Sequence, residues 1–162
     1  MKSFLSALTL GALAVSTSVA QEPRPVLNHD TAMTIVNTCM AWAEERDLNL
    51  TIAIKDQSSR TRVRVEMDDA FPVSWLLADR KAHSALAVRR PTSQMAGLAD
   101  IPGLAEGGEL IPLRGGVIIQ NSDGFVLGSV GVSGATGEQD EQCAMAGVEA
   151  VGLDHGVESA EE

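Results

Sequence analysis

The sequence has 162 residues, which is enough for one domain with a hydrophobic core, and its formal net charge at pH 7 is -10. This acidic balance argues against binding to nucleic acids and to anionic membrane surfaces. Tyrosine is absent and only 3% of the residues are aromatic, so aliphatic side chains must form most of the core.

Residues 1–20 have the features of a secretory signal peptide. A lysine near the start precedes an apolar run from about Phe4 to Val15, and small residues lead up to Ala20. We therefore expect cleavage after Ala20 and a periplasmic or extracellular mature protein. The apolar run is shorter than a spanning helix needs, and no later segment is long and apolar enough, so we expect no membrane span after cleavage. A retained membrane anchor is the alternative.

The mature chain begins with an extended leader, residues 21–29, that contains two prolines. Helical spacing of apolar residues and strict alternation then identify the elements that follow. In chain order we predict a helix over 30–47, a hairpin of strands 50–56 and 61–67, a helix over 73–88, a short helix over 92–98, strands at 110–113, 116–120 and 125–133, and a helix over 136–153.

These elements predict one domain over residues 30–154, followed by an acidic tail at 155–162. Hairpins combined with separate helices indicate an α+β fold, in which helices cover the faces of an antiparallel sheet. Asn28 or Asp30 can cap the first helix, because a short oxygen side chain accepts a bond from a free first-turn N–H.

Cys39 and Cys143 are the two cysteines of the chain. An even pair in an exported protein indicates one disulfide, and the separation is too large for a CxxC redox motif. Two buried free thiols are the alternative. No cluster of zinc ligands accompanies them in the sequence.

The stretch "VGVSGATGEQDEQCAMAG", residues 130–147, passes from a strand pattern through glycines into a helix pattern. Such a turn can bind phosphate, but Glu138 and Asp140 in the first helical turn can themselves satisfy the positive helix end. We therefore favour a sharp structural turn in which Gly134 takes a strained backbone angle and Thr136 caps the helix. The free N–H groups of Ser133 and Gly134 remain secondary candidates for binding a ligand oxygen.

Motifs for hydrolytic catalysis are missing from the sequence. Ser133 is followed two residues later by Ala135, so the GxSxG pattern of a nucleophile elbow is incomplete. The metal-hydrolase pattern HExxH does not occur either. We therefore favour a protein that is not an enzyme.

Two long stretches resemble the GlcG/HbpS-like family: "LADRKAHSALAVRRPTSQMAGLA" and "GELIPLRGGVIIQNSDGFVLGSVGVSGATGEQDEQCAMAGVEAV". The shared features are a lysine-bearing helix that ends in RPT, a PxxGG strand entry, and a GVSG strand before a helix that begins near EQD. The chain departs from the pattern at Arg89, where a small residue or glycine is frequent. The resemblance covers roughly residues 26–153.

The resemblance implies a profilin-like fold, with a five-stranded antiparallel sheet and helices on both faces, and assembly into homo-oligomers. It places the helices of Cys39 and Cys143 side by side, so that a disulfide is geometrically possible. Some family members bind haem, and some secreted ones have a sensor kinase as partner. We therefore expect an exported protein that binds haem or a related tetrapyrrole, with a possible sensor or transport partner. The alternatives are an enzyme that degrades haem or modifies a small molecule, and an oligomeric accessory subunit without a small ligand.

His83 is the candidate ligand for the haem iron, because it lies in the segment that carries the resemblance and Asp79 is one helical turn before it. A surface ion pair between these two side chains is the alternative. Thr92 is a further candidate for contact with the ligand. The cationic side chains of Lys81, Arg90 and Arg114 could pair with the haem propionates. Their alternative role is that of solvated charges or interface salt bridges.

Overall fold

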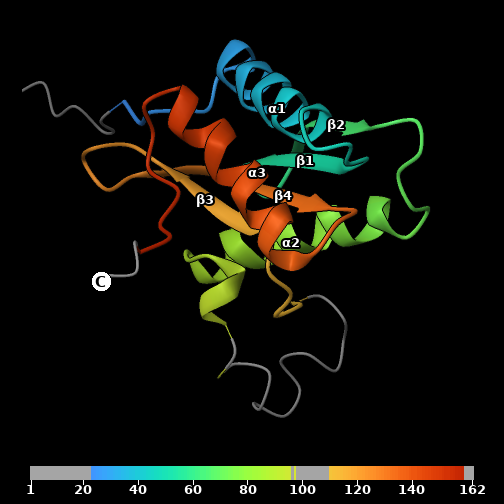
Figure 1. Cartoon of the computed structure of the whole chain (residues 1–162). Coiled ribbons are helices and arrows are strands. Elements are labelled where there is room, and N and C mark those ends of the chain that lie inside the picture. Colours follow the sequence, from blue (N-terminus) through green and yellow to red (C-terminus); the bar gives the residue numbers. More distant parts are fainter. Residues whose placement is uncertain (1–22, 96, 98–109, 159–162) are drawn as a thin grey trace, which may run out of the picture.

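The computed structural model describes residues 23–95, 97 and 110–158, so the signal peptide predicted for residues 1–20 lies outside the described part (Figure 1). Within these residues, four strands form one antiparallel sheet in the order β2-β1-β4-β3. The strands are β1 (Thr51–Asp56), β2 (Thr61–Glu66), β3 (Gly116–Gln120) and β4 (Val126–Ser133). The helices are α1 (His29–Glu44), α2 (Ser74–Val88), the short 3-10 helix η1 (Thr92–Gln94) and α3 (Gly137–Ala150).

Helices cover both faces of the sheet, as the sequence resemblance implied. Helices α1 and α3 pack side by side on one face, and α2 lies on the opposite face (Figure 1). The face beneath α1 and α3 carries the hydrophobic core, to which β1 and β4 contribute large aliphatic residues. These core residues are Ile52, Ile54, Val130 and Val132. They alternate along the strands with residues that point to α2, because successive side chains of a strand point to opposite faces.

The sheet face beneath α2 has small side chains, and the helix approaches it closely. Ala53 and Gly131 are opposite each other on β1 and β4. A Cβ atom at Gly131 would collide with the backbone of α2 at Ala78 and Ala82. Ser129, on the same face, donates a hydrogen bond of 2.7 Å to the Ala82 carbonyl. This close approach fixes where the side chains of α2 lie relative to the sheet.

The prediction of a fifth strand at residues 110–113 is wrong. The Ile111 N–H donates to the Ser84 hydroxyl of α2 at 2.8 Å rather than to a neighbouring strand. Pro112 has no N–H to donate, and pairing with β4 begins only at Gly115, whose carbonyl accepts from Val132 N–H at 2.8 Å. The short helix predicted over 92–98 is only the single turn of η1, with residues 96 and 98 outside the described part.

Helix caps and the disulfide agree with the predictions. Asn28 caps α1 by accepting a 2.8 Å bond from the Thr31 N–H. Thr136 caps α3 in a capping box with Gln139. Cys39 and Cys143 form a disulfide between α1 and α3, with their Cα atoms 4.8 Å apart. Among the described residues, no helix has both the length and the apolar character needed to cross a membrane.

Candidate functional site

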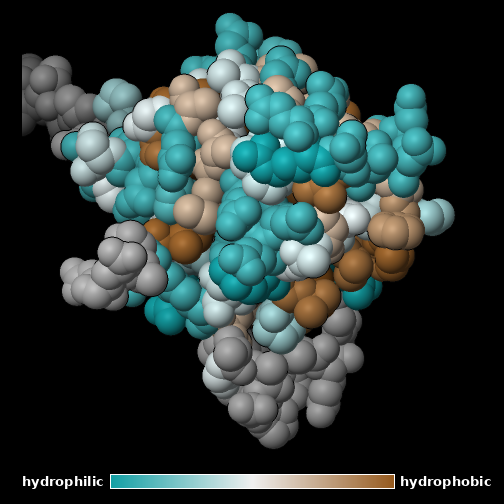
Figure 2. All heavy atoms as spheres, viewed as in Figure 1, coloured by the Kyte–Doolittle hydropathy of each residue, from teal (hydrophilic) through white to brown (hydrophobic). Residues whose placement is uncertain are grey.

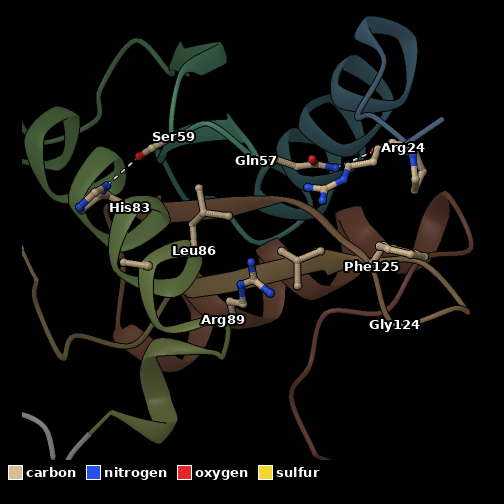
Figure 3. Close-up of a pocket in the computed structure, with 11 residues that line it drawn as sticks. Arg24, Gln57, Ser59, His83, Leu86, Arg89, Gly124 and Phe125 are labelled. Atoms are coloured by element: carbon tan, nitrogen blue, oxygen red, sulfur yellow. Dashed lines mark hydrogen bonds between the residues drawn. The ribbon is translucent and has the colours of Figure 1, made fainter. Parts of the chain in front are cut away.

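A cleft of about 580 Å³ opens between four segments that are far apart in the sequence (Figure 3). Its volume lies within the range of about 300–1,000 Å³ that is typical of small-molecule sites. The leader contributes Arg24 and Pro25, the β1–β2 turn contributes Gln57 and Ser59, the end of α2 contributes His83, Leu86, Ala87 and Arg89, and the β3–β4 connection with the first residue of β4 contributes Gly124, Phe125 and Val126.

Two hydrogen bonds connect these segments. The His83 Nδ1 and the Ser59 hydroxyl lie 2.8 Å apart, which joins α2 to the hairpin turn. The Gln57 side-chain amide donates to the Pro25 carbonyl at 2.6 Å, which holds the leader against the same turn. Figure 3 shows His83 at the rim, with the nitrogen that does not contact Ser59 directed away from Leu86. The imidazole therefore has a fixed orientation, and its other ring nitrogen, which contacts no polar group among the described residues, can bind a metal.

Asp79 does not orient His83, although it lies one turn earlier on α2. Its carboxylate contacts Lys55 at 2.9 Å and Arg64 at 2.5 Å, and it accepts a further bond from Thr61 at 3.2 Å. Burial raises the pKa of Asp79, but the hydrogen bond and charge of Lys55 and the charge of Arg64 lower it more, so the net pKa lies below its usual value. The expected pairing of Asp79 with the imidazole is therefore wrong.

Lys81 is buried in the interior and does not reach the cleft. Its ammonium donates to the Asp140 carboxylate at 2.7 Å and to the Val132 carbonyl at 2.8 Å. Burial raises the pKa of Asp140 despite the opposing effect of Lys81 and of the Ala135 N–H. Lys81 thus connects α2 to β4 and α3, so its role in this structure is structural.

Arg114 and Thr92 also have structural partners. The Arg114 guanidinium donates twice to the buried Glu141 carboxylate, at 2.6 and 3.1 Å. This bond and the charge of Glu141 raise the pKa of Arg114 above its usual value. The buried Thr92 hydroxyl accepts a 2.9 Å bond from the Gly116 N–H and so fixes η1 against β3. Arg90 is exposed and does not line the cleft.

The turn at Ser133 and Gly134 is a packed strand-to-helix connection. Gly134 has a φ of +142°, and a Cβ atom there would lie 2.5 Å from the Asn49 carbonyl oxygen. Ser133 is buried at the end of β4. The Ala135 N–H donates to Asp140 at 3.0 Å, so an acid of this chain, rather than a ligand, takes that amide. These contacts support the structural turn favoured from the sequence.

Of the residues predicted for ligand binding, His83 therefore lines the cleft, while the others lie elsewhere. Sequence reasoning missed Arg24, Gln57, Ser59, Arg89 and Phe125. They belong to a leader and to connections between elements, where no periodicity marks a function. The one signal available for any of them was the departure of Arg89 from the family pattern.

A second cleft, of about 430 Å³, adjoins the first on the other side of Gln57. It contains His29 at the start of α1, together with the charged residues Asp56 and Arg62 and the apolar Leu127. The sequence offered no reason to prefer His29 over His83. The structure places both imidazoles beside clefts, whereas His155 contacts Glu149 at 3.0 Å near the end of the described chain.

A comparison with known families decides what this architecture belongs to. The family described as "Haem degrading protein HbpS-like" matches residues 27–149, which include all the described helices and strands except the last residue of α3. The chain belongs to the HbpS-like family. The expectation drawn from the sequence resemblance is confirmed at this level.

Solved structures of HbpS-like proteins show the same fold. A double mutant of Streptomyces reticuli HbpS is 29% identical, covers 88% of this chain and 99% of its own, and superposes with a TM-score of 0.75. The structure named "PduOC:Heme Complex" has a TM-score of 0.77 at 24% identity, with 81% and 99% of the two chains covered. At that identity the second likeness concerns the fold alone.

Among curated relatives, the corrinoid adenosyltransferase PduO of Citrobacter freundii is 29% identical over 147 residues. The match spans 86% of this chain but only 43% of PduO. The PduO of Salmonella typhimurium is matched over 34% of its length. The similarity thus concerns less than half of each PduO chain.

Proposed function

We propose that this HbpS-like chain binds haem or a related tetrapyrrole in the cleft beside His83. The observation that carries the proposal is the imidazole of His83, which Ser59 holds at the rim of a cleft of about 580 Å³. Membership of the HbpS-like family supports this ligand class, and solved relatives include a structure named as a haem complex.

The described residues fit a haem better than a bare metal ion. Among them, no group of three or more His, Cys, Asp or Glu side chains could hold a metal on its own. A porphyrin itself supplies most ligands of its iron, so the protein needs to add few. His83 would bind the iron, and Leu86 and Phe125 would contact the apolar ring. Bound haem would supply a redox-active iron.

Titration of the purified mature protein with haemin, followed by the Soret band, tests this proposal. We expect saturable binding by the wild type, and we expect His83→Ala to shift the band and to weaken binding about tenfold or more. His155→Ala is the matched control, because it removes an imidazole that lines neither cleft. Lack of saturable binding by the wild type would refute the function and favour an accessory subunit without a small ligand.

His29 provides the internal alternative for the iron ligand. It lies in the adjoining cleft, and the free nitrogen of His83 is directed away from Leu86 (Figure 3). If His29→Ala abolishes the Soret shift while His83→Ala leaves it unchanged, the function stands and the iron ligand is His29. Met95 is buried in the interior, where it fills space, and does not line either cleft.

Haem degradation is the second candidate function, because the description of the matching family names it. One experiment on the purified, haem-loaded protein distinguishes haem degradation from haem binding alone. Loss of the Soret band in the presence of a reductant and oxygen, with release of a bile pigment, would identify an enzyme. A band that stays constant over hours supports binding alone.

We also propose that the protein is exported and forms homo-oligomers. The Cys39–Cys143 disulfide supports an oxidising compartment. Large apolar side chains are exposed around the start of α2, namely Phe71, Trp75 and Leu76. Figure 2 shows hydrophobic residues gathered at that end of the molecule. Light scattering on the mature protein tests the assembly, and a monomer at micromolar concentration would refute it.

A further inference from the structure

The cleft beside His83 is positively charged although the protein as a whole is acidic. The chain has 22 Asp and Glu residues against 12 Lys and Arg, yet the described lining of the cleft includes Arg24, Arg89 and no carboxylate. A concave site that concentrates one sign of charge raises the local concentration of ligands of the opposite sign. The charge of this cleft therefore favours an anion.

Arg24 and Arg89 both have their charges free for a ligand. Among the described residues, neither guanidinium lies within salt-bridge distance of a carboxylate. Figure 3 shows the two side chains entering the cleft from different sides. Leu86 and Phe125 also line it, so apolar side chains adjoin the charged groups.

The backbone at Arg89, beside the cleft, has a strained conformation. Arg89 ends α2 in the left-handed conformation, with φ 54° and ψ 41°. Glycine is the usual residue at this position of a helix end, because it adopts these angles without steric cost. An arginine adopts this conformation only at a steric cost. Strained residues of this kind cluster at binding and active sites.

Arg24 is held in place although it belongs to the leader. Three residues later, Leu27 is buried in the hydrophobic core. Between them, the Pro25 carbonyl accepts the 2.6 Å hydrogen bond from Gln57. The leader therefore presents Arg24 from a position that two contacts anchor.

We propose that Arg24 and Arg89 bind two carboxylates of one ligand, so that the cleft selects dianionic molecules with an apolar body. Each planar guanidinium can make two parallel charge-assisted hydrogen bonds to a carboxylate. The inference rests on the proposed function, since it names the ligand class that the same site takes. It also replaces Lys81, Arg90 and Arg114 as the residues that recognise the acidic groups of the ligand.

Binding of a metal-free porphyrin tests the arginines without the iron. We would measure by fluorescence the affinities for deuteroporphyrin IX, which has two carboxylates, and for its dimethyl ester. Arg24→Ala and Arg89→Ala should each weaken binding of the dicarboxylate about tenfold or more and leave ester binding nearly unchanged. Arg60→Ala is the matched control, because it removes the same charge from an exposed residue beside Ser59 that does not line the cleft.

Arg89→Gly separates binding from stability. Glycine relieves the strained conformation, so the variant should melt about 2 to 4 °C higher than the wild type. Its affinity for deuteroporphyrin should nevertheless fall as far as that of Arg89→Ala. A purely structural Arg89 would give higher stability with unchanged binding, and that result would overturn the proposal.

The remaining outcomes distinguish this inference from the proposed function. If haemin binds and His83→Ala shifts its spectrum, but both arginine variants bind the dicarboxylate like the wild type, the role of the arginines is refuted and haem binding stands. Equal affinity of the wild type for the dicarboxylate and its ester would also refute it. If the wild type binds neither haemin nor deuteroporphyrin, both proposals are overturned.

Discussion

Replacement of Lys81 by methionine should strongly destabilise the protein, because it leaves the buried Asp140 carboxylate without its cation. The Lys81 and Asp140 side chains are only 4% and 2% exposed, and their charged atoms are 2.7 Å apart. Breaking such a buried pair by removal of one partner typically costs about 3–5 kcal/mol. Domains of this size have a total unfolding free energy of about 5–15 kcal/mol, so the loss should be large.

The cost of Lys81→Met should depend on pH, and the sign follows from Asp140. Burial already raises the pKa of Asp140 in the presence of Lys81, and removal of the cation should raise it further. A carboxyl with a raised pKa in the folded state destabilises the protein once the pH exceeds its unfolded pKa of about 3.9. The variant should therefore lose most stability above the folded pKa and recover part of it as the pH falls toward 4.

Urea unfolding at pH 4.5 and pH 8, followed by circular dichroism with the disulfide intact, measures this effect. The double variant Lys81→Met/Asp140→Leu is the control, since removal of both charges should restore much of the loss at pH 8. A cost below about 1 kcal/mol at pH 8, or the same cost at both pH values, would refute our reasoning. Haemin affinity of the folded variant should match that of the wild type, because Lys81 lies outside the cleft.

Two further predictions concern the disulfide and the acid limit of stability. Thiol titration of the unfolded, unreduced protein should find no reactive thiol, and two reactive thiols per chain would contradict the bridge. The variant Cys39→Ala/Cys143→Ala should lose up to about 4.7 kcal/mol of unfolding free energy, because the bridge closes a loop of about 100 residues. Asp79→Asn should lose less stability on acidification than the wild type. The pKa of Asp79 is lowered in the folded protein, so its contribution to stability is complete above its unfolded pKa of about 4 and is lost as the pH falls through its folded pKa. Equal losses in both proteins between about pH 6 and pH 2, measured by urea unfolding, would show that Asp79 contributes nothing.

The helices and strands could be predicted because their signals are local. Alternation over 61–67 and helical spacing over 73–88 agree with β2 and α2 to within one residue at each end. The caps depend on contacts between residues three positions apart, so Asn28 and Thr136 could be identified from their neighbours alone. The strand at 110–113 failed because apolar character alone does not show whether a partner strand or a helix accepts the backbone bonds.

The candidate site was harder to predict because residue type does not reveal burial or long-range partners. Lysines and arginines usually lie in solvent, and Lys81 therefore had the character of a ligand contact. In the fold it meets Asp140, which is 59 residues away in the sequence, and Arg114 meets Glu141. Arg24 and Arg89, by contrast, gave no sequence pattern that connects them.

By itself the sequence determined the family and the α+β class and predicted the pairing of its two cysteines, because these depend on periodicity, motifs and composition. Only the tertiary structure decided which charges are free for a ligand. Lys81 of α2 and Asp140 of α3 are buried together and form an ion pair. Arg24 and Arg89 lie in one cleft, because the leader, a turn and the end of a helix come together there. The physical reason is that the energy of a charge depends on its solvent exposure and its nearest partners, and chain folding sets both.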